Sequence, residues 1–362
     1  MDKFSYQKVK NELLDEVRTM PIGARLLSRP ELAKKYDVSR TTIDKAISEL
    51  IGEHYLYAID GSGTYVAEQY KIQSDERKEE LYKSWGVVLP DIRHDTYPGI
   101  LRGIEDVANE NEINIIICNS DNNVKKQSEY IDKLLRTKVS GVIMVPAITN
   151  EDCHETFARL VDEIPVVFCN RAVDGVKGPK VFSNNFFGAY LATKHLLSNG
   201  YKNIAFITKQ WYPTAMERFQ GYISALNEAH KDTNEALYTF ETDEEGKIDV
   251  ALAARNLLSQ CHDVDAIFCF NDTIAKSVYP EVLKAGYEVG INFGLVGYDN
   301  THICDQMPVK LTSVQFKTYE IGKEAARLMI RMMSGENIPS NKVIVLQPQL
   351  EIRESSLHKS RM

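Results

Sequence analysis

The sequence predicts an α/β protein with three parts. These are a small helical domain that ends in a β-hairpin (residues 1–69), a linker (70–84) and a larger two-lobed domain (85–362). Residues 1–69 carry apolar residues at helical spacing, followed by a hairpin pattern. After residue 84, apolar runs alternate with amphipathic stretches, which is typical of parallel sheets covered by helices. About 270 residues with this pattern exceed one ordinary core, so we expect two lobes.

The composition is that of a globular protein, with 43% hydrophobic and 26% charged residues. No apolar run approaches the roughly 18 residues that span a bilayer, and no secretory signal follows Met1. Cys118, Cys169 and Cys269 lie in apolar runs, and no C-x-x-C pair occurs, so we expect buried, reduced thiols. We therefore expect a cytoplasmic protein that does not associate with a membrane.

The charge neither indicates nor excludes a nucleic-acid partner. The formal net charge is −8, and the cations of residues 1–69 face a similar number of acids. Because DNA binding needs a local basic face and not a basic protein, any argument for it must rest on the arrangement of residues.

The first two predicted helices lie before residue 37. The first covers about residues 5–20, has apolar residues at helical spacing and ends at Pro21-Ile22-Gly23. The second begins at Ser28-Arg29-Pro30-Glu31, a capping box in which Ser28 and Glu31 satisfy each other's backbone amides.

A third helix follows a short turn and begins after Ser39, a good N-cap residue. Its apolar stripe consists of Ile43, Ala46, Ile47 and Leu50. The residues that then point away from the core are Thr41, Asp44, Lys45 and Ser48, with Arg40 beside them in the first turn. Two short helices joined by a tight turn, the second with polar and basic groups at its N-terminal end, form a helix-turn-helix.

A β-hairpin follows this helix-turn-helix. Residues 55–59 and 64–66 read as its strands, and Asp60-Gly61-Ser62-Gly63 as a tip that can approach a groove closely. The ordered set of three helices and a wing predicts a winged helix-turn-helix. The alternative is a small packing module without a role in DNA binding.

Two motifs in this region resemble a known family. Ser39-Arg40-Thr41-Thr42-Ile43 and Gly61-Ser62-Gly63-Thr64-Tyr65-Val66 are similar to the GntR-type winged helix, over nearly all of residues 4–67. The resemblance implies operator DNA as a partner. The candidate DNA-binding residues are Arg29, Ser39, Arg40, Thr41, Thr42, Lys45 and Gly63.

The chain departs from this family at two positions. Family members usually carry arginine where this chain has Pro30 and Asp44. An acid at residue 44 cannot bind a phosphate, so the operator sequence can differ. As a hypothesis, Arg29 replaces the arginine lost at residue 30. Unchanged operator affinity in an Arg29→Ala variant would overturn that hypothesis.

In the larger domain, polar residues follow the predicted strands. The apolar runs are residues 86–89, 115–118, 141–145, 166–169, 204–207, 266–270 and 294–297. Ligands of open α/β sheets bind beyond the carboxyl ends of the strands. The residues found there are Asp91, His94, Asp95, Tyr97, Asn170, Arg171, Asn184, Asn185, Asn271, Asp272, Asp299, Asn300 and Gln315. This set suits a polyhydroxylated ligand; the alternative for each residue is a turn former or a helix cap.

Residues 85–355 resemble the LacI/GalR effector domain and the related periplasmic sugar-binding proteins. The matching motifs are Asn170-Arg171, residues 184–189, residues 217–222, Phe270-Asn271-Asp272, residues 296–299 and residues 311–315. The resemblance implies two Rossmann-like lobes of the periplasmic-binding-protein type, joined by three crossovers, with a ligand in the cleft. It implies that the ligand is bound by Arg171, Arg218, Asn271, Asp299 and Gln315, with Tyr97 packed against it. Asn184 stands where the family often has aspartate.

A GntR-type reader joined to a LacI-type sensor resembles the arabinose repressor group. L-arabinose is therefore the first expected effector, with other pentoses, hexoses and nucleosides open. We expect a homodimer that represses transcription from an operator and that the sugar releases. A ligand that acts as co-repressor, and a ligand-binding protein without DNA activity, remain alternatives.

An enzyme acting on sugars is not expected. The chain has no P-loop, no G-x-G-x-x-G after a strand, no G-x-S-x-G elbow and no metal-spaced histidine pair. We therefore predict no catalytic residue, metal or cofactor, although Asp91 and Asp299 could form a carboxylate pair across the cleft.

Overall fold

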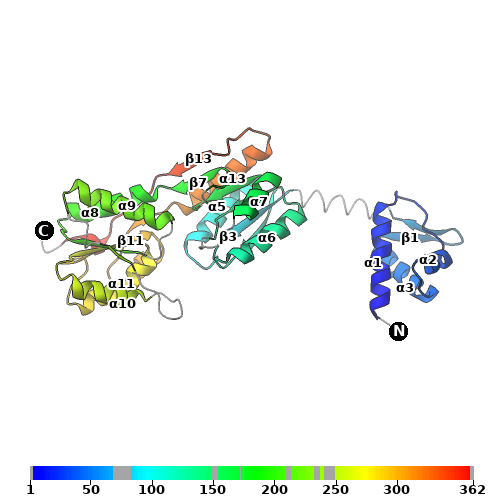
Figure 1. Ribbon diagram of the computed structural model, residues 1–362, viewed down its shortest axis with the longest axis horizontal. Coiled ribbons are helices and arrows are strands. Elements are labelled where there is room, and N and C mark those ends of the chain that lie inside the picture. Colours follow the sequence, from blue (N-terminus) through cyan, green and yellow to red (C-terminus); the bar gives the residue numbers. More distant parts are fainter. Residues whose placement is uncertain are drawn as a thin grey trace. The chain divides into compact units, whose positions relative to one another are not determined.

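The computed structural model describes residues 3–67, 83–147, 154–171, 173, 175–208, 213–231, 237–239 and 249–358. The chain divides into two compact units, Met1–Lys83 and Ser84–Met362 (Figure 1). Ser84, which the sequence analysis assigned to the linker, is the first residue of a strand. The predicted linker residues 70–82 lie outside the described residues.

The first unit is a winged helix, as predicted. Its elements are α1 (Lys3–Thr19), α2 (Arg29–Lys35), α3 (Arg40–Gly52), β1 (Leu56–Ile59) and β2 (Gly63–Val66). The strands β1 and β2 pair antiparallel. The predicted stripe of α3 is buried, and it packs against the following apolar residues of α1, α2 and the hairpin: Val9, Leu13, Val17, Leu32, Leu56 and Val66. The described residues of this core all lie within 9–66.

Both predicted helix starts carry the expected capping residues. The backbone amide and hydroxyl of Ser28 donate to the Glu31 carboxylate, at 2.8 and 2.6 Å, and these bonds lower the pKa of Glu31. The hydroxyl oxygen of Ser39 accepts a hydrogen bond from the Thr42 amide at 3.2 Å. These contacts satisfy helix-end amides and set the directions of α2 and α3.

The second unit contains two lobes, each built on one sheet. Lobe 1 has strands in the order β13-β7-β6-β5-β3-β4, all parallel. Its strands are β3 (Ser84–Leu89), β4 (Asn114–Asn119), β5 (Gly141–Met144), β6 (Val166–Cys169), β7 (Lys180–Ser183) and β13 (Val343–Leu346). Its helices are α5 (Thr96–Glu110), α6 (Val124–Thr137), α7 (His154–Glu163) and α13 (Thr318–Met333).

Lobe 2 has the strand order β14-β12-β11-β10-β8-β9, in which β14 alone is paired antiparallel within the described strands. Its strands are β8 (Ile204–Thr208), β9 (Leu237–Thr239), β10 (Ala266–Cys269), β11 (Gly294–Asp299), β12 (Thr312–Gln315) and β14 (Gln349–Glu351). Its helices are α8 (Asn185–Ser198), α9 (Pro213–Glu228), α10 (Val250–Gln260), α11 (Asp272–Lys284) and α12 (Ile303–Gln306), followed near the end by a 3-10 turn, Glu354–Ser356.

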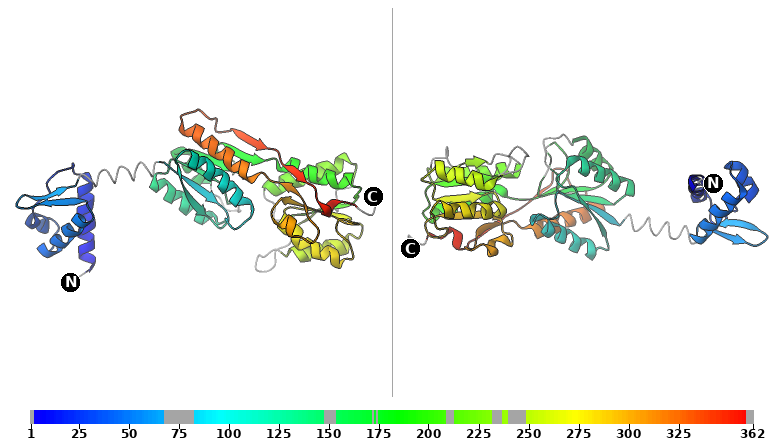
Figure 2. Two further views of the ribbon diagram at one scale, coloured as in Figure 1. Left: turned by 180° about the vertical axis from the view of Figure 1, so that it is seen from behind. Right: turned by 90° about the horizontal axis from the view of Figure 1, so that it is seen from below.

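Helices cover both faces of each sheet (Figure 2). The chain passes between the lobes three times, from β7 to α8, from β12 to α13 and from β13 to β14. The predicted pair of parallel α/β lobes with three crossovers is therefore confirmed. Neither lobe is made from one continuous stretch of sequence.

One strand differs from the prediction that the apolar runs are buried on both faces. β4 is the outer strand of the lobe 1 sheet, and Ile117 in it is 47% exposed. An outer strand has a neighbour on one edge only, so its apolar side chains are covered less completely than those of central strands.

Two helix pairs pack with their backbones in close contact. A Cβ atom at Gly103 of α5 would lie 2.1 Å from the Tyr319 carbonyl oxygen of α13, and one at Gly322 would lie 2.0 Å from that of Ile100. On lobe 2, a Cβ at Gly221 of α9 would lie 2.0 Å from the Phe186 carbonyl oxygen of α8. These close backbone contacts fix α5 against α13 and α9 against α8. Both α5 and α9 carry residues that line the cleft.

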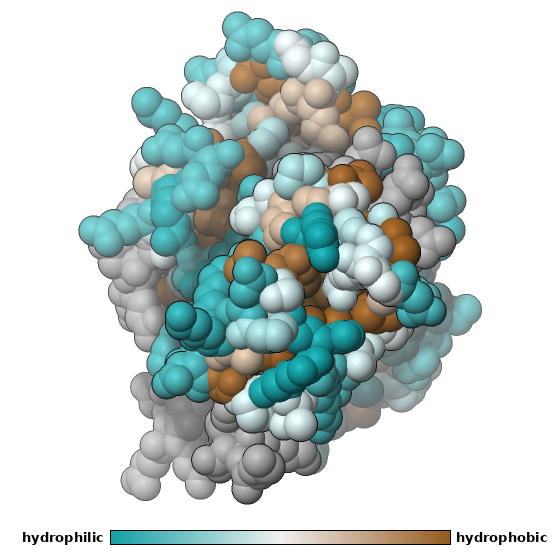
Figure 3. Space-filling view, turned by 90° about the vertical axis from the view of Figure 1, so that its right-hand side faces the viewer, coloured by the Kyte–Doolittle hydropathy of each residue, from teal (hydrophilic) through white to brown (hydrophobic). Residues whose placement is uncertain are grey.

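The face in Figure 3 is largely hydrophilic, with hydrophobic residues in small separate areas. Within the described parts of the chain, no helix combines the length and the apolar character needed to cross a membrane.

Candidate ligand cleft and nucleic-acid interface

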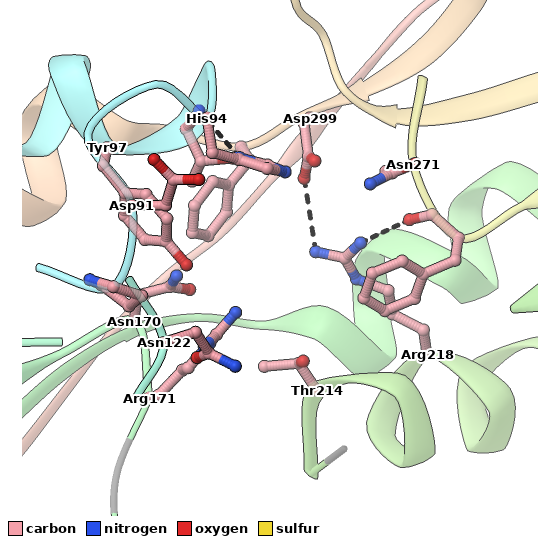
Figure 4. A pocket seen from close by; sticks show the side chains of 14 residues that line it. Asp91, His94, Tyr97, Asn122, Asn170, Arg171, Thr214, Arg218, Asn271 and Asp299 are labelled. Carbon is pink, nitrogen blue, oxygen red and sulfur yellow. Dashed lines mark hydrogen bonds and ion pairs between the residues drawn. The ribbon is translucent and has the colours of Figure 1, made fainter. Parts of the chain in front are cut away.

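A cavity of about 200 Å³ lies at the carboxyl ends of strands from both lobes (Figure 4). Lobe 1 and its loops contribute Pro90, Asp91, His94, Thr96, Tyr97, Asn122, Asn170 and Arg171, and lobe 2 and the crossover after β12 contribute Thr214, Arg218, Phe270, Asn271, Asp299 and Phe316. The volume is below the roughly 300–1,000 Å³ of pockets for drug-sized ligands, which favours a small ligand.

The structure brings together most of the residues expected to hold a ligand. Tyr97, Arg171, Arg218, Asn271 and Asp299 all line the cavity. Gln315 does not line it: this residue ends β12, in register with Asp299 on one side and Gln349 on the other. Successive residues of an extended chain point in opposite directions, and it is the next residue, Phe316, that lines the cavity.

Arg218 is buried and held on several sides. Its guanidinium carbon lies 3.5 Å from the centre of the Tyr298 ring and 4.4 Å from that of Phe270. Its Nε donates to the Asn185 side-chain oxygen at 3.1 Å, and an Nη donates to the Phe270 carbonyl. The other Nη forms an ion pair with Asp299 at 3.4 Å. This arginine therefore organises the lobe 2 wall in addition to facing the cavity.

The ends of two strands adopt the left-handed conformation at the cavity. Asn170, after β6, has φ 59°, while Asp299 and Asn300, at the end of β11, have φ 95° and 50°. Non-glycine residues at such angles are strained, and they persist where the surrounding contacts fix them. Here those contacts include the Arg218–Asp299 ion pair and a hydrogen bond from the Asn300 amide to the Ser313 hydroxyl.

Asp272 lies behind this wall and holds it. Its carboxylate accepts hydrogen bonds from the Ser313 hydroxyl at 2.6 Å, and from the amide and hydroxyl of Thr301 at 2.7 and 3.0 Å. Burial, and secondly the charge of Asp299, raise the pKa of Asp272 to about 6. Asp272 is absent from the cavity lining, so its part is to position the loop that follows Asp299.

Two asparagines of the predicted set are helix caps, as the alternative reading proposed. The side-chain oxygen of Asn184 accepts from the Phe187 amide at 3.0 Å, and that of Asn271 accepts from the Ile274 amide at 2.9 Å. The side-chain nitrogen of Asn271 faces the cavity (Figure 4). Asn271 therefore caps α11 and also lines the cavity.

Six lining residues were not predicted from the sequence as ligand contacts: Pro90, Thr96, Asn122, Thr214, Phe270 and Phe316. Asn122 lies three residues beyond the end of β4, so its place at the cavity depends on the turn that follows the strand. Thr214 precedes Arg218 by four residues on α9, which places both on one helix face. That spacing was the signal that could have identified it.

The charges of the lining are balanced. The carboxylates are Asp91 and Asp299, and the guanidiniums are Arg171 and Arg218. Arg218 is paired with Asp299, and bonds from Arg93 lower the pKa of Asp91. The lining therefore offers no excess of positive charge to a phosphate or carboxylate ligand, whereas hydroxyl groups can donate to both carboxylates and accept from the arginines. The lining therefore suits a neutral polyhydroxylated molecule.

The candidate DNA-binding residues gather at the start of α3 and at the wing. Arg40, Thr41 and Lys45 are exposed. The Ser39 hydroxyl lies 2.7 Å from that of Thr41 and 2.8 Å from that of Thr42, so these small groups form one polar cluster at the helix start. Their part in DNA binding remains a prediction.

An arginine that was not predicted from the sequence, Arg25, packs against the wing. Gly63 has φ 142°, and a Cβ atom there would lie 2.8 Å from Nε of Arg25. The backbone of Arg25 forms a bridge with Tyr65. A basic side chain therefore lies directly against the wing glycine expected to approach a groove of the DNA.

Comparison with known families confirms both resemblances. Residues 5–66 match the bacterial regulatory proteins of the gntR family, and residues 193–356 match the periplasmic binding protein-like domain.

Two relatives that align with 90% or more of this chain are named as transcriptional regulators. The arabinose metabolism transcriptional repressor of Halalkalibacterium halodurans is 26% identical over 361 residues, which is 98% of this chain and 96% of that protein. The HTH-type transcriptional regulator RegA of Clostridium saccharobutylicum is 29% identical over 90% of this chain and 98% of its own.

Solved structures show the same fold for the larger domain. The transcription regulator CcpA of Lactococcus lactis is 26% identical and has a TM-score of 0.66, over 75% of this chain and 98% of that one. A LacI family regulator of Enterococcus faecium with bound ribose is also 26% identical, with a TM-score of 0.63, over 75% of this chain and 98% of that one.

Proposed function

We propose that this chain, which joins a gntR-family winged helix to a periplasmic-binding-protein-like domain, is a cytoplasmic transcriptional repressor of sugar-utilisation genes. A small sugar releases it from its operator. The observation that carries the proposal is the cavity of amides, carboxylates, arginines and aromatic rings at the strand ends, in the same chain as a DNA-reading fold. Relatives that span nearly the whole chain are repressors.

L-arabinose is the first candidate effector. Two relatives are named arabinose metabolism transcriptional repressors, and a similar solved structure holds ribose, another pentose. In the cavity, Asp91 and Asp299 would accept from sugar hydroxyls, and Arg171, Arg218 and Asn271 would donate to sugar oxygens. Tyr97 would pack against the C–H face.

Coupling between sugar and DNA requires two conformations of the protein. A sugar that contacts both lobes prefers the conformation in which they are closed around it. If that conformation binds operator less well, the sugar acts as an inducer, with about 1–3 kcal/mol of coupling in typical cases. If it binds operator better, the same ligand is a co-repressor.

The proposal includes a homodimer and no catalytic activity. Helix-turn-helix proteins bind two half-sites about one helical turn apart, so a symmetric operator requires two copies of α3. In each copy, the groups proposed to face DNA are Arg25, Arg29, Ser39, Arg40, Thr41, Thr42, Lys45 and Gly63. Light scattering of the purified protein measures its mass directly, and a strictly monomeric protein would contradict this part.

The experiment that tests the function begins with thermal shifts against pentoses, hexoses, nucleosides and sugar phosphates. A ligand that binds the folded state raises its melting temperature. We expect a neutral pentose to raise it, and the response to be lost in Arg171→Ala but kept in Arg159→Ala, an exposed arginine of α7 outside the cavity. The active compound is then added to protein bound to operator DNA.

The outcomes separate the alternatives. Release of the DNA supports an inducer, and tighter binding identifies a co-repressor. Sugar binding without any specific DNA binding would favour a ligand-binding protein, and turnover of the bound sugar would favour an enzyme. Absence of a response to every neutral sugar would refute the sugar-sensor part.

A further inference from the structure

An ion pair joins the two helices of the helix-turn-helix. Nε of Arg29, the first residue of α2, lies 2.8 Å from Oδ1 of Asp44 on α3. The two side chains are 42% and 44% exposed, yet both contacting atoms are shielded from solvent. The contact therefore holds Nε of Arg29 against one carboxylate oxygen of Asp44, while the rest of each side chain is accessible to solvent.

Asp44 lies on the face of α3 that is turned away from the core. Thr41 and Ser48, three and four residues from Asp44 on the helix, are exposed, as is its neighbour Lys45, whereas Ile43 and Ile47 are buried. In a helix-turn-helix this is the face that enters the major groove. An acid on that face comes close to base edges and to the phosphates of both strands.

An unpaired carboxylate in that place would be repelled by the DNA backbone. Arg29 removes this cost because its cation lies in contact with Asp44 and because α2, the first helix of the motif, crosses the backbone. The pair is neutral as a whole. Its contribution to folding is small, since half-exposed ion pairs contribute about 0–1 kcal/mol, so stability alone gives little reason for an acid there.

We propose that Asp44 reads a base of the operator and selects cytosine, and that Arg29 is the positioning residue that orients and neutralises it. This inference rests on the proposed function. In the major groove, guanine presents only acceptors, thymine an acceptor and a methyl group, and adenine an acceptor beside its amino group. Cytosine presents its N4 amino donor with an acceptor on one side only, O6 of the paired guanine, whereas the amino group of adenine lies between its own N7 and O4 of the paired thymine. A carboxylate oxygen that accepts from a base amino group therefore meets the least repulsion at cytosine.

The test is selection of DNA by the full-length protein, without sugar, from a library of randomised duplexes. Wild-type protein is expected to require cytosine at one position of each half-site. Asp44→Ala is expected to lose that preference, of about tenfold, at that position alone. Asp44→Asn is expected to select adenine there, because an amide pairs with both the amino group and N7 of adenine.

Arg29 is tested by a double-mutant cycle on the selected DNA. Arg29→Ala is expected to weaken binding to every sequence, because it leaves the carboxylate uncompensated, and Arg29→Ala/Asp44→Ala is expected to recover part of that loss. Lys45→Ala, on the same exposed face, serves as the matched control: it is expected to lower affinity without changing the base preference. Melting temperatures of all variants verify folding.

Two outcomes overturn the inference and are distinguishable. If wild-type protein selects a clear operator and the Asp44 variants select the same bases at every position, the pair is structural only. If wild-type protein selects no sequence at all, the proposed function has failed, and this inference fails with it.

Discussion

At the scale of single residues, the two arginines of the cavity have different surroundings. Arg218 is buried between two aromatic rings and paired with Asp299, which is itself only 9% exposed. Arg171 is half-buried and donates to the Asn122 side chain at 3.4 Å. One therefore belongs to the folded framework of lobe 2, while the other is more accessible to a ligand.

Replacing Arg218 by alanine should affect stability as well as binding. The variant leaves Asp299 as a buried charge without its partner, which costs about 3–5 kcal/mol. Arg171→Ala should change the unfolding free energy by about 1 kcal/mol or less and still abolish the thermal response to sugar. Urea denaturation of both variants measures the difference. Equal loss of unfolding free energy in the two variants would show that Arg218 stabilises the fold no more than Arg171 does.

The pKa of Asp272 predicts a pH dependence of stability. Burial raises this pKa from 3.8 to about 6, so the folded state holds the proton more tightly than the unfolded chain. The stabilisation is complete below pH about 4 and is lost as the pH rises through about 6, by about 3 kcal/mol in total.

Asp272→Asn cannot titrate and therefore serves as the reference. The unfolding free energy of wild type minus that of Asp272→Asn should fall as the pH rises from about 4 to about 7. Urea titrations of both proteins across this range measure it. A difference that does not vary with pH would mean that Asp272 keeps an ordinary pKa.

The sequence predicted the chemistry of the cavity better than its geometry. Residues placed directly after apolar runs, such as Arg171 and Asp299, could be found because strand ends of parallel sheets meet at one edge. Gln315 and Phe316 could not be separated, since which of two neighbours faces inward depends on where the strand ends. The second role of Asn271, as a helix cap, also depends on local geometry that residue type alone does not specify.

At the scale of elements, the packing of α5 against α13 depends on glycine. Gly103→Ala would place a methyl group 2.1 Å from the Tyr319 carbonyl oxygen, so the helices must separate. We expect a loss of about 1–3 kcal/mol. Arg102→Ala, at the exposed neighbouring position of α5, is the control and should remain within about 0.5 kcal/mol. Chemical denaturation distinguishes them, and equal stabilities would contradict the close approach.

Central strands were predicted more easily than outer ones. β3, β5 and β10 are buried along their whole length and appear in the sequence as continuous apolar runs. β13 alternates between exposed and half-buried residues, and β14 is short and mostly polar. Their positions are set by pairing with β7 and β12, which are distant in the sequence, so local pattern could not reveal them.

At the scale of the whole molecule, the winged helix has a core of its own. The apolar residues that the structure describes in that core all lie between Val9 and Val66. A fragment of residues 1–83 should therefore fold alone and melt cooperatively, as measured by circular dichroism. It should bind operator more weakly than the full chain, because it lacks the larger domain proposed to dimerise, and its binding should not respond to sugar. A fragment that stays unfolded would contradict the independence of the two units.

The three passages of the chain between the lobes also affect the order in which a nascent protein matures. The winged helix is complete once residue 67 has emerged from the ribosome, whereas the lobe 1 sheet must wait for β13 at residues 343–346 and the lobe 2 sheet for β14 at 349–351. Domains fold as units during synthesis, N-terminal first. A chain cut short by a premature stop codon would thus carry an intact reader and no working sensor. On the proposed function, such a product would bind operator weakly and without any response to the sugar.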